Sequence, residues 1–302
     1  MMQARRFNFN LPARILEPMT SRPPFSHLES AYQLHFYLCF KTHYLREALV
    51  GDTEQQLVNT TAEAVCAKEG YHLLETRVEP AHVRLLLSLK PDQSISQAVQ
   101  RLKGTISRRF SATFATRLPE LRMPTLWARG YFARSAGKVS LDNVRSYVDS
   151  QIAHHGYRGA WTEGLRYSNP QFKSPVFTLE HCLPILQYHL VLVTDFRIPI
   201  FDEVIAPKLF DYVIAIGEKR GFAVDRVTVL PDHVHLLIEA VPSLTIGDCA
   251  LSLMNNTRHW MENKYWGVLK QANAWDVWRP SFYAGTVGEY TTAQVRRFLS
   301  QS

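Results

Sequence analysis

The stretch Pro231-Asp232-His233-Val234-His235-Leu236-Leu237-Ile238 has a counterpart 151 residues earlier, Pro80-Ala81-His82-Val83-Arg84-Leu85-Leu86-Leu87. A glycine and an aromatic residue precede each stretch at the same separation, Gly70-Tyr71 in one case and Gly221-Phe222 in the other. Residues i and i+2 of a strand share a face, so both histidines of the later stretch project together while Val234 turns into the core. The chain is therefore predicted to contain two copies of one unit.

The same offset returns further along both copies, from Trp127 to Trp278, Gly137 to Gly288, Ser140 to Thr291 and Tyr147 to Phe298. These matches divide the 302 residues into four predicted parts. They are an N-terminal extension rich in Pro and Arg (1–30), repeat one (31–153), a linker (154–184) and repeat two (185–302).

Each repeat is predicted to begin β-α-β, to continue with another helix and to close on a final helix. The expected first strands are 32–40 and 187–193, the next helices 54–68 and 208–220, and the later helices 95–110 and 246–263. Gly70 and Gly221 stand where a helix ends in a left-handed residue. Thr291 and Gln294 have the spacing of a capping box, and Ser140 can cap the equivalent helix of repeat one.

Composition narrows the class of protein. The net charge is +7 and the pI is near 9.2, which favours a polyanionic partner, nucleic acid before membrane. No apolar run approaches the roughly 18 residues that a membrane-spanning helix needs. The four cysteines are scattered without a Cys-x-x-Cys pair, as in a cytoplasmic protein with reduced thiols: Cys39, Cys66, Cys182 and Cys249.

Two imidazoles on one face of a strand make half of a site for a divalent metal. An isolated His-x-His pair is more often structural or a surface feature, so the motif gains weight only from its surroundings. In the earlier copy the second histidine is replaced by Arg84. A guanidinium is always charged and has no lone pair to give, so that copy is expected to repel a cation.

The frame around the histidines resembles the signature of single-tyrosine HUH transposases, which mobilise bacterial insertion sequences as single-stranded DNA. The resemblance covers roughly 31–153 and 185–302. Besides the His stretch, it rests on Leu102-Lys103-Gly104-x-x-Ser107-Arg108-Arg109-Phe110, Leu126-Trp127-x-Arg129-Gly130-Tyr131-Phe132-Ala133-x-Ser135-x-Gly137 and Tyr147-x-x-x-Gln151.

The resemblance implies an α+β fold: two ferredoxin-like (RRM-like) domains that form a pseudo-dimer with their sheets joined edge to edge. In this family the His pair of one subunit works with the tyrosine helix of the other. The tyrosine attacks a DNA phosphodiester and leaves a 5′-phosphotyrosine. A Mg²⁺ or Mn²⁺ is held by the His pair and by a polar residue one turn past the tyrosine.

Carried onto this chain, the resemblance implies Tyr147 as the nucleophile and His233, His235 and Gln151 as metal ligands. Tyr147 and Gln151 are four residues apart and would share a helix face. Repeat one has the tyrosine but lacks the His pair, and repeat two has the His pair but lacks the tyrosine. The residues at the lost positions form a degenerate set: His82, Arg84, Phe298 and Ser302. The economical interpretation is one composite site built from both repeats.

Basic residues concentrate in repeat one. Residues 101–134 contain eight Lys or Arg against one acidic residue, while 252–285 contain four against two. Repeat one is therefore the expected DNA-binding surface. The candidates, with Phe132 as a further aromatic, are Arg101, Lys103, Arg108, Arg109, Arg129, Arg134, Trp127 and Tyr131. The alternative is a solvated helix face with Trp127 in the core.

We therefore expect a metal-dependent, transposase-like nickase and ligase, monomeric and cytoplasmic, acting on single-stranded DNA at hairpins or palindromic ends. One alternative is a catalytically silent, domesticated DNA-binding protein that recognises hairpins. An RNA-binding module is a weaker alternative, because the aromatic residues of RRM sheet motifs are absent.

Overall fold

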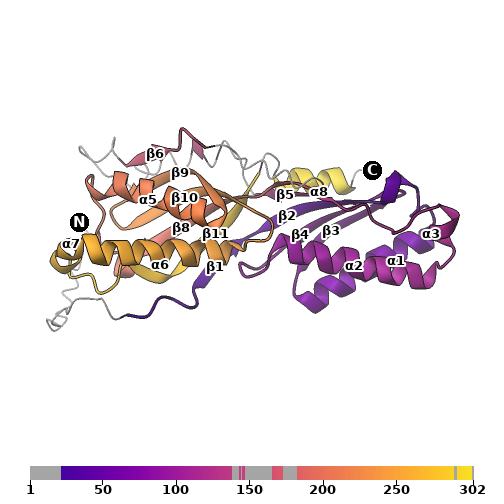
Figure 1. Ribbon diagram of the computed structural model, residues 1–302, viewed down its shortest axis with the longest axis horizontal. Helices are drawn as coiled ribbons and strands as arrows, with labels where there is room; N and C mark the ends of the chain where they lie inside the picture. The colour runs from indigo at the N-terminus through magenta and orange to yellow at the C-terminus, as the bar shows by residue number, and fades with distance from the viewer. Residues whose placement is uncertain are drawn as a thin grey trace, which may run out of the picture.

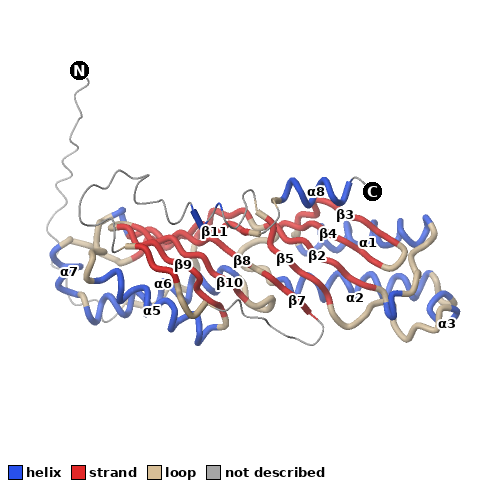
Figure 2. The backbone as a smooth tube through the Cα atoms, turned by 90° about the horizontal axis from the view of Figure 1, so that it is seen from above, coloured by secondary structure: helices blue, strands red, loops and turns tan. Residues whose placement is uncertain are grey.

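The computed structural model describes residues 22–137, 143, 145–146, 165–172, 182–288 and 291–300. Two α/β bodies lie end to end along the long axis of the molecule, with repeat two on the left and repeat one on the right in Figure 1. Each body has helices on one face of a β-sheet, and the two sheets meet in the middle (Figure 2).

Repeat one has the element order β-α-β-β-α-β of a ferredoxin-like fold. Its core sheet has the order β3-β4-β2-β5, with every neighbouring pair antiparallel. The short helices η1 (His43–Leu45) and α3 (Arg117–Glu120) lie in its loops. The elements of the core are β2 (His35–Lys41), α1 (Asp52–Glu69), β3 (His72–Glu79), β4 (His82–Ser88), α2 (Ile95–Thr113) and β5 (Tyr131–Ala136).

Repeat two repeats this plan with the core sheet order β11-β8-β10-β9. Its shorter helices are η3 (Asp195–Arg197) and α7 (Trp266–Gln271), and its last helix is α8 (Thr292–Ser300). The core elements are β8 (Gln187–Thr194), α5 (Ile205–Arg220), β9 (Phe222–Leu230), β10 (His233–Ala240), α6 (Ile246–Lys264) and β11 (Trp278–Val287). The prediction of two tandem ferredoxin-like domains is confirmed.

The helices end where the sequence indicates. Gly70 and Gly221 follow α1 and α5 with φ of 72° and 85°, the left-handed conformation that glycine adopts without strain. The Thr291 hydroxyl accepts from the Gln294 amide N–H at 3.2 Å, and the Gln294 side chain accepts from the Thr291 N–H at 2.8 Å. This reciprocal pair is the expected capping box at the start of α8.

The two sheets are joined by an exchange of strands. β1 (Glu29–Gln33) runs on into β2 but pairs in parallel with β11 of the other repeat. In the same way, β7 (Cys182–Ile185) runs on into β8 but pairs in parallel with β5. Each repeat thus lends the start of its first strand to the edge of the other sheet, and the two sheets are coupled edge to edge as predicted.

Segments outside the two predicted repeats also form strands. Strand β1 begins inside the predicted N-terminal extension. The predicted linker supplies β7 and β6 (Arg166–Ser168), and β6 pairs antiparallel with β9 at the outer edge of its sheet. A backbone segment that completes a sheet edge carries no hydrophobic period of its own, so the sequence pattern does not mark it.

Two hydroxyls 151 residues apart bridge the strands at the junction. The Ser135 hydroxyl donates to the Val287 carbonyl and accepts from the Gln187 N–H. The Thr286 hydroxyl donates to the Ala136 carbonyl at 2.6 Å and accepts from the His35 N–H at 2.9 Å. These equivalent bridges give the junction an approximate twofold symmetry.

Backbones approach closely at this junction, and Gly288 is the residue that permits it. A Cβ at Gly288 would lie 2.2 Å from the carbonyl oxygen of Ser135. We expect Gly288→Ala to reduce the free energy of unfolding by about 1–3 kcal/mol, the usual cost of overpacking. Chemical denaturation of the variant and the wild type would measure this difference in the free energy of unfolding. The control is Gly104→Ala in α2, where a Cβ meets nothing within 4 Å. That variant should gain up to about 1 kcal/mol through helix propensity, so an equal loss in both variants would contradict the explanation.

The long helices of each repeat, α1 and α2 in repeat one and α5 and α6 in repeat two, cover one face of its sheet. In repeat one, alternate residues of β2 and β4, among them Leu38 and Leu85 at 0% exposure, face α1 and α2. The opposite face, called here the open face, carries Tyr37, Arg84 and their neighbours. Cys39, Cys66 and Cys249 are free thiols and are buried.

Helix α8 belongs to repeat two but packs against the open face of repeat one (Figures 1 and 2). Leu299, 6% exposed, is in a hydrophobic cluster with Leu86 and Ala136. Arg296 Nε donates to Glu75 Oε1 of β3 at 3.0 Å. The last helix of repeat two therefore packs against the sheet of repeat one.

Candidate functional site

His233 and His235 lie on β10 and face away from the helices. Both are buried, at 3% and 4% exposure, and their ring centroids are 5.1 Å apart. Val234, between them, is 2% exposed in the hydrophobic core against α5 and α6. The strand periodicity thus places the two imidazoles together, as the sequence predicts.

Each imidazole is engaged through its Nδ1 atom. His233 Nδ1 lies 2.6 Å from Asp232 Oδ1, and Arg197 Nε donates to the other carboxylate oxygen at 2.8 Å. Burial alone would raise the pKa of Asp232, but hydrogen bonds and charge from His233 and Arg197 outweigh it and hold that pKa below its ordinary value. The carboxylate therefore stays ionised and orients the ring of His233.

His235 Nδ1 meets a third histidine, His189 of β8, at 3.0 Å from its Nε2. The two rings are nearly parallel, at 12°, with centroids 5.2 Å apart. Burial lowers the pKa of His189 to about 4, so its ring is neutral near pH 7. Sequence reasoning missed His189. The available signal was the strand alternation, which puts every second residue of 187–193 on the open face.

This donor set fits a divalent cation of the Mg²⁺ or Mn²⁺ class only in part. Metal-binding histidines donate a hydrogen bond from their second ring nitrogen to a carboxylate or another acceptor, as His233 does with Asp232. Among the described residues, no group of three His, Cys, Asp or Glu side chains is placed to hold a metal ion. The His pair would need a further ligand from elsewhere in the chain or from a substrate.

The equivalent place in repeat one is filled by an ion-pair network. Arg84 Nε donates to Glu79 Oε2 at 2.9 Å, and its Nη1 donates to the Tyr37 hydroxyl at 3.0 Å. Arg77 Nε binds the other oxygen of Glu79 at 3.1 Å. Burial, followed by the charge of Arg84, lowers the pKa of His82. A hydrogen-bonded guanidinium thus stands in repeat one at the place that His235 takes in repeat two.

The helix that precedes Tyr147 makes a contact with the other repeat. Asn143, Arg145 and Ser146 are helical, and both Nε and Nη2 of Arg145 lie 3.1 Å from Asp225 Oδ2 on β9. Arg145 and Arg296 are 151 residues apart, so this ion pair is the counterpart of Arg296–Glu75.

The remaining candidates near the end of each repeat are described only in part. Tyr147, Gln151 and Ser302 lie outside the described residues, as does Ser140. The backbone of Phe298 belongs to α8, but its side chain is not among those described.

The predicted DNA-binding residues do not form one surface. Arg101, Arg108 and Arg109 are exposed on α2, on the helical side of the sheet, and Arg129 is exposed in the loop before β5. Arg134 lies on the open face, with its guanidinium 5.3 Å from the ring of Phe132. The sequence does not reveal this division, because both groups fall within one basic window.

Three of these candidates have structural contacts instead. Trp127 is 7% exposed and its Nε1 donates to the Lys103 carbonyl at 3.0 Å, so its burial favours the core alternative over stacking on bases. The Lys103 ammonium donates to the carbonyls of Ala128 and Gly130, both at 2.8 Å. The Tyr131 hydroxyl lies 3.4 Å from the Ser96 hydroxyl.

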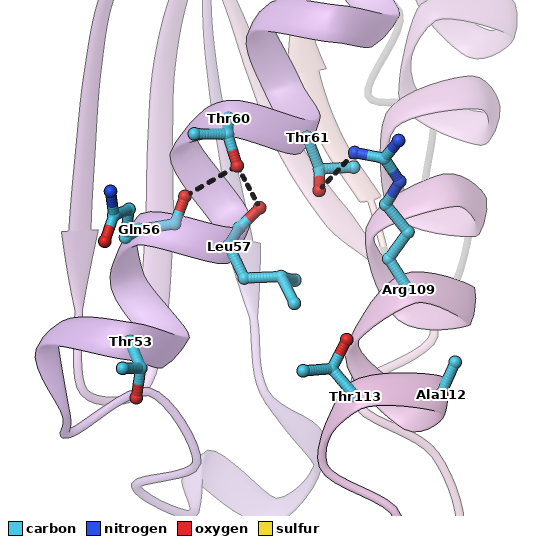
Figure 3. A pocket seen from close by; sticks show the side chains of 8 residues that line it. All are labelled: Thr53, Gln56, Leu57, Thr60, Thr61, Arg109, Ala112 and Thr113. Atoms are coloured by element: carbon cyan, nitrogen blue, oxygen red, sulfur yellow. Dashed lines mark hydrogen bonds between the residues drawn. The ribbon is translucent and has the colours of Figure 1, made fainter.

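An open groove of about 470 Å³ separates α1 and α2 on the helical side of repeat one (Figure 3). Arg109 reaches across it, with Nη1 3.5 Å from the Thr61 hydroxyl. The lining is rich in hydroxyl groups: Thr53, Gln56, Leu57, Thr60, Thr61, Arg109, Ala112 and Thr113. The groove lies in repeat one beside the exposed arginines of α2, whereas the His pair lies on the sheet of repeat two.

Comparisons with known proteins agree with the tandem arrangement. The family model "Transposase IS200 like" matches residues 30–151 and 182–302. The ISDra2 transposase TnpA of Deinococcus radiodurans is 31% identical over 114 residues, which are 38% of this chain and 81% of that protein. The transposase for insertion sequence element IS200 of Salmonella typhimurium is 25% identical over 117 residues, 39% of this chain and 76% of that protein.

Two solved structures are similar over less than half of the chain. A putative transposase from Deinococcus radiodurans R1 has 25% identity and a TM-score of 0.31, with 42% of this chain and 95% of that chain covered. A REP-associated tyrosine transposase bound to a REP hairpin has 12% identity and a TM-score of 0.27, with 46% and 76% covered. In the part of the chain that the structure describes, no helix is long and apolar enough to cross a membrane.

Proposed function

Because this chain belongs to the IS200-like transposase family, we propose that it cuts and rejoins single-stranded DNA at one composite site. Tyr147 of repeat one supplies the nucleophile, and His233 and His235 of repeat two supply the metal ligands. The observation that carries the proposal is the ion pair between Arg145 and Asp225. It ties a residue two positions before Tyr147 to the sheet that bears the His pair.

The proposed reaction is a transesterification. The phenol oxygen of Tyr147 attacks a backbone phosphorus, a phosphotyrosine bond to the 5′ side forms, and the bond to the 3′ oxygen breaks. The phenol proton leaves with the freed 3′-hydroxyl. A tyrosine of ordinary pKa near 10 is only about 0.1% ionised at pH 7, so the site must assist this proton transfer. Attack by a 3′-hydroxyl on the phosphotyrosine reverses the step and joins the strand.

His233, His235 and Gln151 would hold a Mg²⁺ or Mn²⁺ ion. When bound, such an ion supplies Lewis-acid polarisation of the phosphate. Asp232 orients His233 by accepting its Nδ1 proton, and this hydrogen bond leaves Nε2 of that ring as the ligand atom. In repeat one, Arg84 takes the equivalent place and keeps that site free of metal.

One chain then provides one phenol, because Phe298 takes the place of Tyr147 in repeat two. A single chain can hold one covalent 5′ end at a time, so it nicks and reseals, whereas moving a two-ended element requires two chains. Pairing of the repeats within the chain satisfies the sheet edges that would otherwise drive dimerisation, so we propose that the protein is a monomer. We further propose that it is cytoplasmic and acts on hairpins or palindromic ends.

The proposal is tested by incubating the protein with a hairpin-bearing oligonucleotide labelled on the 3′ side of the cut. A covalent adduct that resists denaturing electrophoresis, requires Mg²⁺ or Mn²⁺ and disappears with a chelator is expected. DNA binding without any adduct across a panel of such hairpins would instead support the silent, domesticated DNA-binding protein.

The exposed basic face of α2 gives a separate prediction. We expect Arg108→Ala with Arg109→Ala to weaken single-stranded DNA binding and to reduce the slope of log K against log salt by about 1.4, roughly 0.7 for each lost phosphate contact. Fluorescence anisotropy over a salt series would measure the slope. The matched control is Arg220→Ala, an exposed arginine at the end of α5 in repeat two. An unchanged slope in the double variant would place the DNA on another face.

A further inference from the structure

The open faces of the two sheets carry different side-chain pairs at the same two places. In repeat two, His189 Nε2 lies 3.0 Å from His235 Nδ1. By strand register Tyr37 holds the place of His189, just as Arg84 holds that of His235. In repeat one this pair is joined too, since Arg84 Nη1 donates to the Tyr37 hydroxyl at 3.0 Å.

Both members of the pair therefore differ together between the repeats, and the contact between them is kept. Where the site has lost its second histidine, the partner position holds a hydroxyl that accepts from a guanidinium. Where the site has both histidines, the partner position holds an imidazole. This correspondence indicates that the residue at position 189 is matched to the chemistry of His235.

The neighbouring histidine donates its hydrogen bond through the same ring atom, Nδ1. His233 Nδ1 lies 2.6 Å from Asp232 Oδ1, and an ionised carboxylate only accepts, so the neutral form of this ring has its proton on Nδ1 and its lone pair on Nε2. His235 is engaged through the same ring atom. If its Nδ1 also donates, both rings of the pair keep their Nε2 lone pairs, as two ligands of one ion require.

We propose that His189 is a positioning residue whose Nε2 accepts the Nδ1 proton of His235 and so keeps the lone pair of His235 on Nε2. The inference rests on the proposed function in that the metal gives the tautomer its purpose. The tautomer itself is a property of the metal-free protein. His189 does not act as a ligand through Nε2, because that atom is occupied by His235.

The test compares two substitutions at position 189 with a control in the other repeat. His189→Phe keeps a flat ring but removes the acceptor, whereas His189→Gln retains an acceptor at similar reach. Tyr37→Phe is the matched control, because it removes the equivalent contact in the repeat without the His pair. Thermal melts confirm that each variant is folded before it is compared.

The first readout is the ring nitrogen spectrum of His235 in the full-length, metal-free protein, assigned by difference against His235→Gln. Wild type, His189→Gln and Tyr37→Phe should show a protonated Nδ1 and an unprotonated Nε2. His189→Phe should shift the proton toward Nε2, the tautomer that a free imidazole favours. If His235 of wild type carries its proton on Nε2, or if His189→Phe leaves the tautomer unchanged, the inference is overturned.

The second readout is Mn²⁺ affinity by titration calorimetry. Loss of a group that orients a ligand typically weakens metal binding about 10- to 100-fold, so His189→Phe should fall in that range and His189→Gln should recover most of it. Failure of wild type to bind Mn²⁺ would contradict the proposed metal site, while the nitrogen spectrum would still decide the role of His189.

Discussion

Replacing Tyr147 by phenylalanine should remove the covalent protein–DNA adduct, with a loss of cleavage on the order of 10³-fold or more. Phenylalanine keeps the ring and its packing but has no oxygen to attack phosphorus, so binding should survive. Denaturing electrophoresis of the variant with a labelled hairpin oligonucleotide measures the adduct, and anisotropy measures the binding.

The control for this variant lies in the degenerate half-site. His82 sits beside the guanidinium of Arg84, which we expect to repel a cation, so His82→Ala should leave adduct formation nearly intact. An adduct that persists in Tyr147→Phe, or one that vanishes in His82→Ala, would show that the nucleophile or the working His pair has been assigned to the wrong repeat.

Removing either imidazole of the pair should separate cleavage from binding. We expect His233→Ala and His235→Ala each to reduce Mn²⁺-dependent cleavage by a factor on the order of 10² or more. Removing a metal ligand should lower activity more than removing a residue that only orients a ligand. Affinity for single-stranded DNA should stay within about threefold, because the proposed phosphate contacts lie in repeat one.

Cleavage rates at saturating DNA and binding isotherms, measured on the same preparations, make this separation visible. Both rings are buried, so folding must be checked by thermal melts. A His variant that is folded but loses binding as severely as cleavage would show that the pair is structural, with Asp232 and His189 as its structural partners.

The features that the sequence could predict are those with a short period. Alternation along β10 puts Val234, Leu236 and Ile238 into the core at 2% exposure or less, and the histidines on the other face. Gly70 and Gly221 end their helices in the left-handed conformation because other residues rarely adopt it. The capping box at Thr291 could also be predicted, because it depends only on the identity of two residues three positions apart.

The features that escaped prediction depend on contacts between distant parts of the chain. His189 has no motif of its own, and its importance appears only when β8 pairs with β10 and brings it to His235. The parallel pairing of β1 with β11 is made by backbone hydrogen bonds, so the pattern of side chains does not predict it. The ion pair of Arg145 with Asp225 likewise joins residues whose proximity follows from the fold alone.

Trp127 shows why residue type alone misleads. An aromatic residue in a basic window suits stacking on bases and suits a core equally well, and the sequence left both alternatives open. The indole is buried, with its N–H satisfied by the Lys103 carbonyl. Arg134 and Arg108 lie in the same window but on opposite faces of the sheet, because one is on a strand and the other on a helix.

We propose that the last helix of each repeat works with the His stretch of the other repeat, and moving the phenol from one helix to the other tests this pairing. Tyr147→Phe combined with Phe298→Tyr places the only phenol of these two positions on α8, which packs on β3 and β4 beside Arg84. We expect no covalent adduct from this variant, and an adduct once Ala81→Asp, Arg84→His and Ser302→Gln rebuild the site in repeat one. An adduct in the variant that carries only the two tyrosine–phenylalanine exchanges would contradict the proposed pairing, because α8 would then reach His233 and His235.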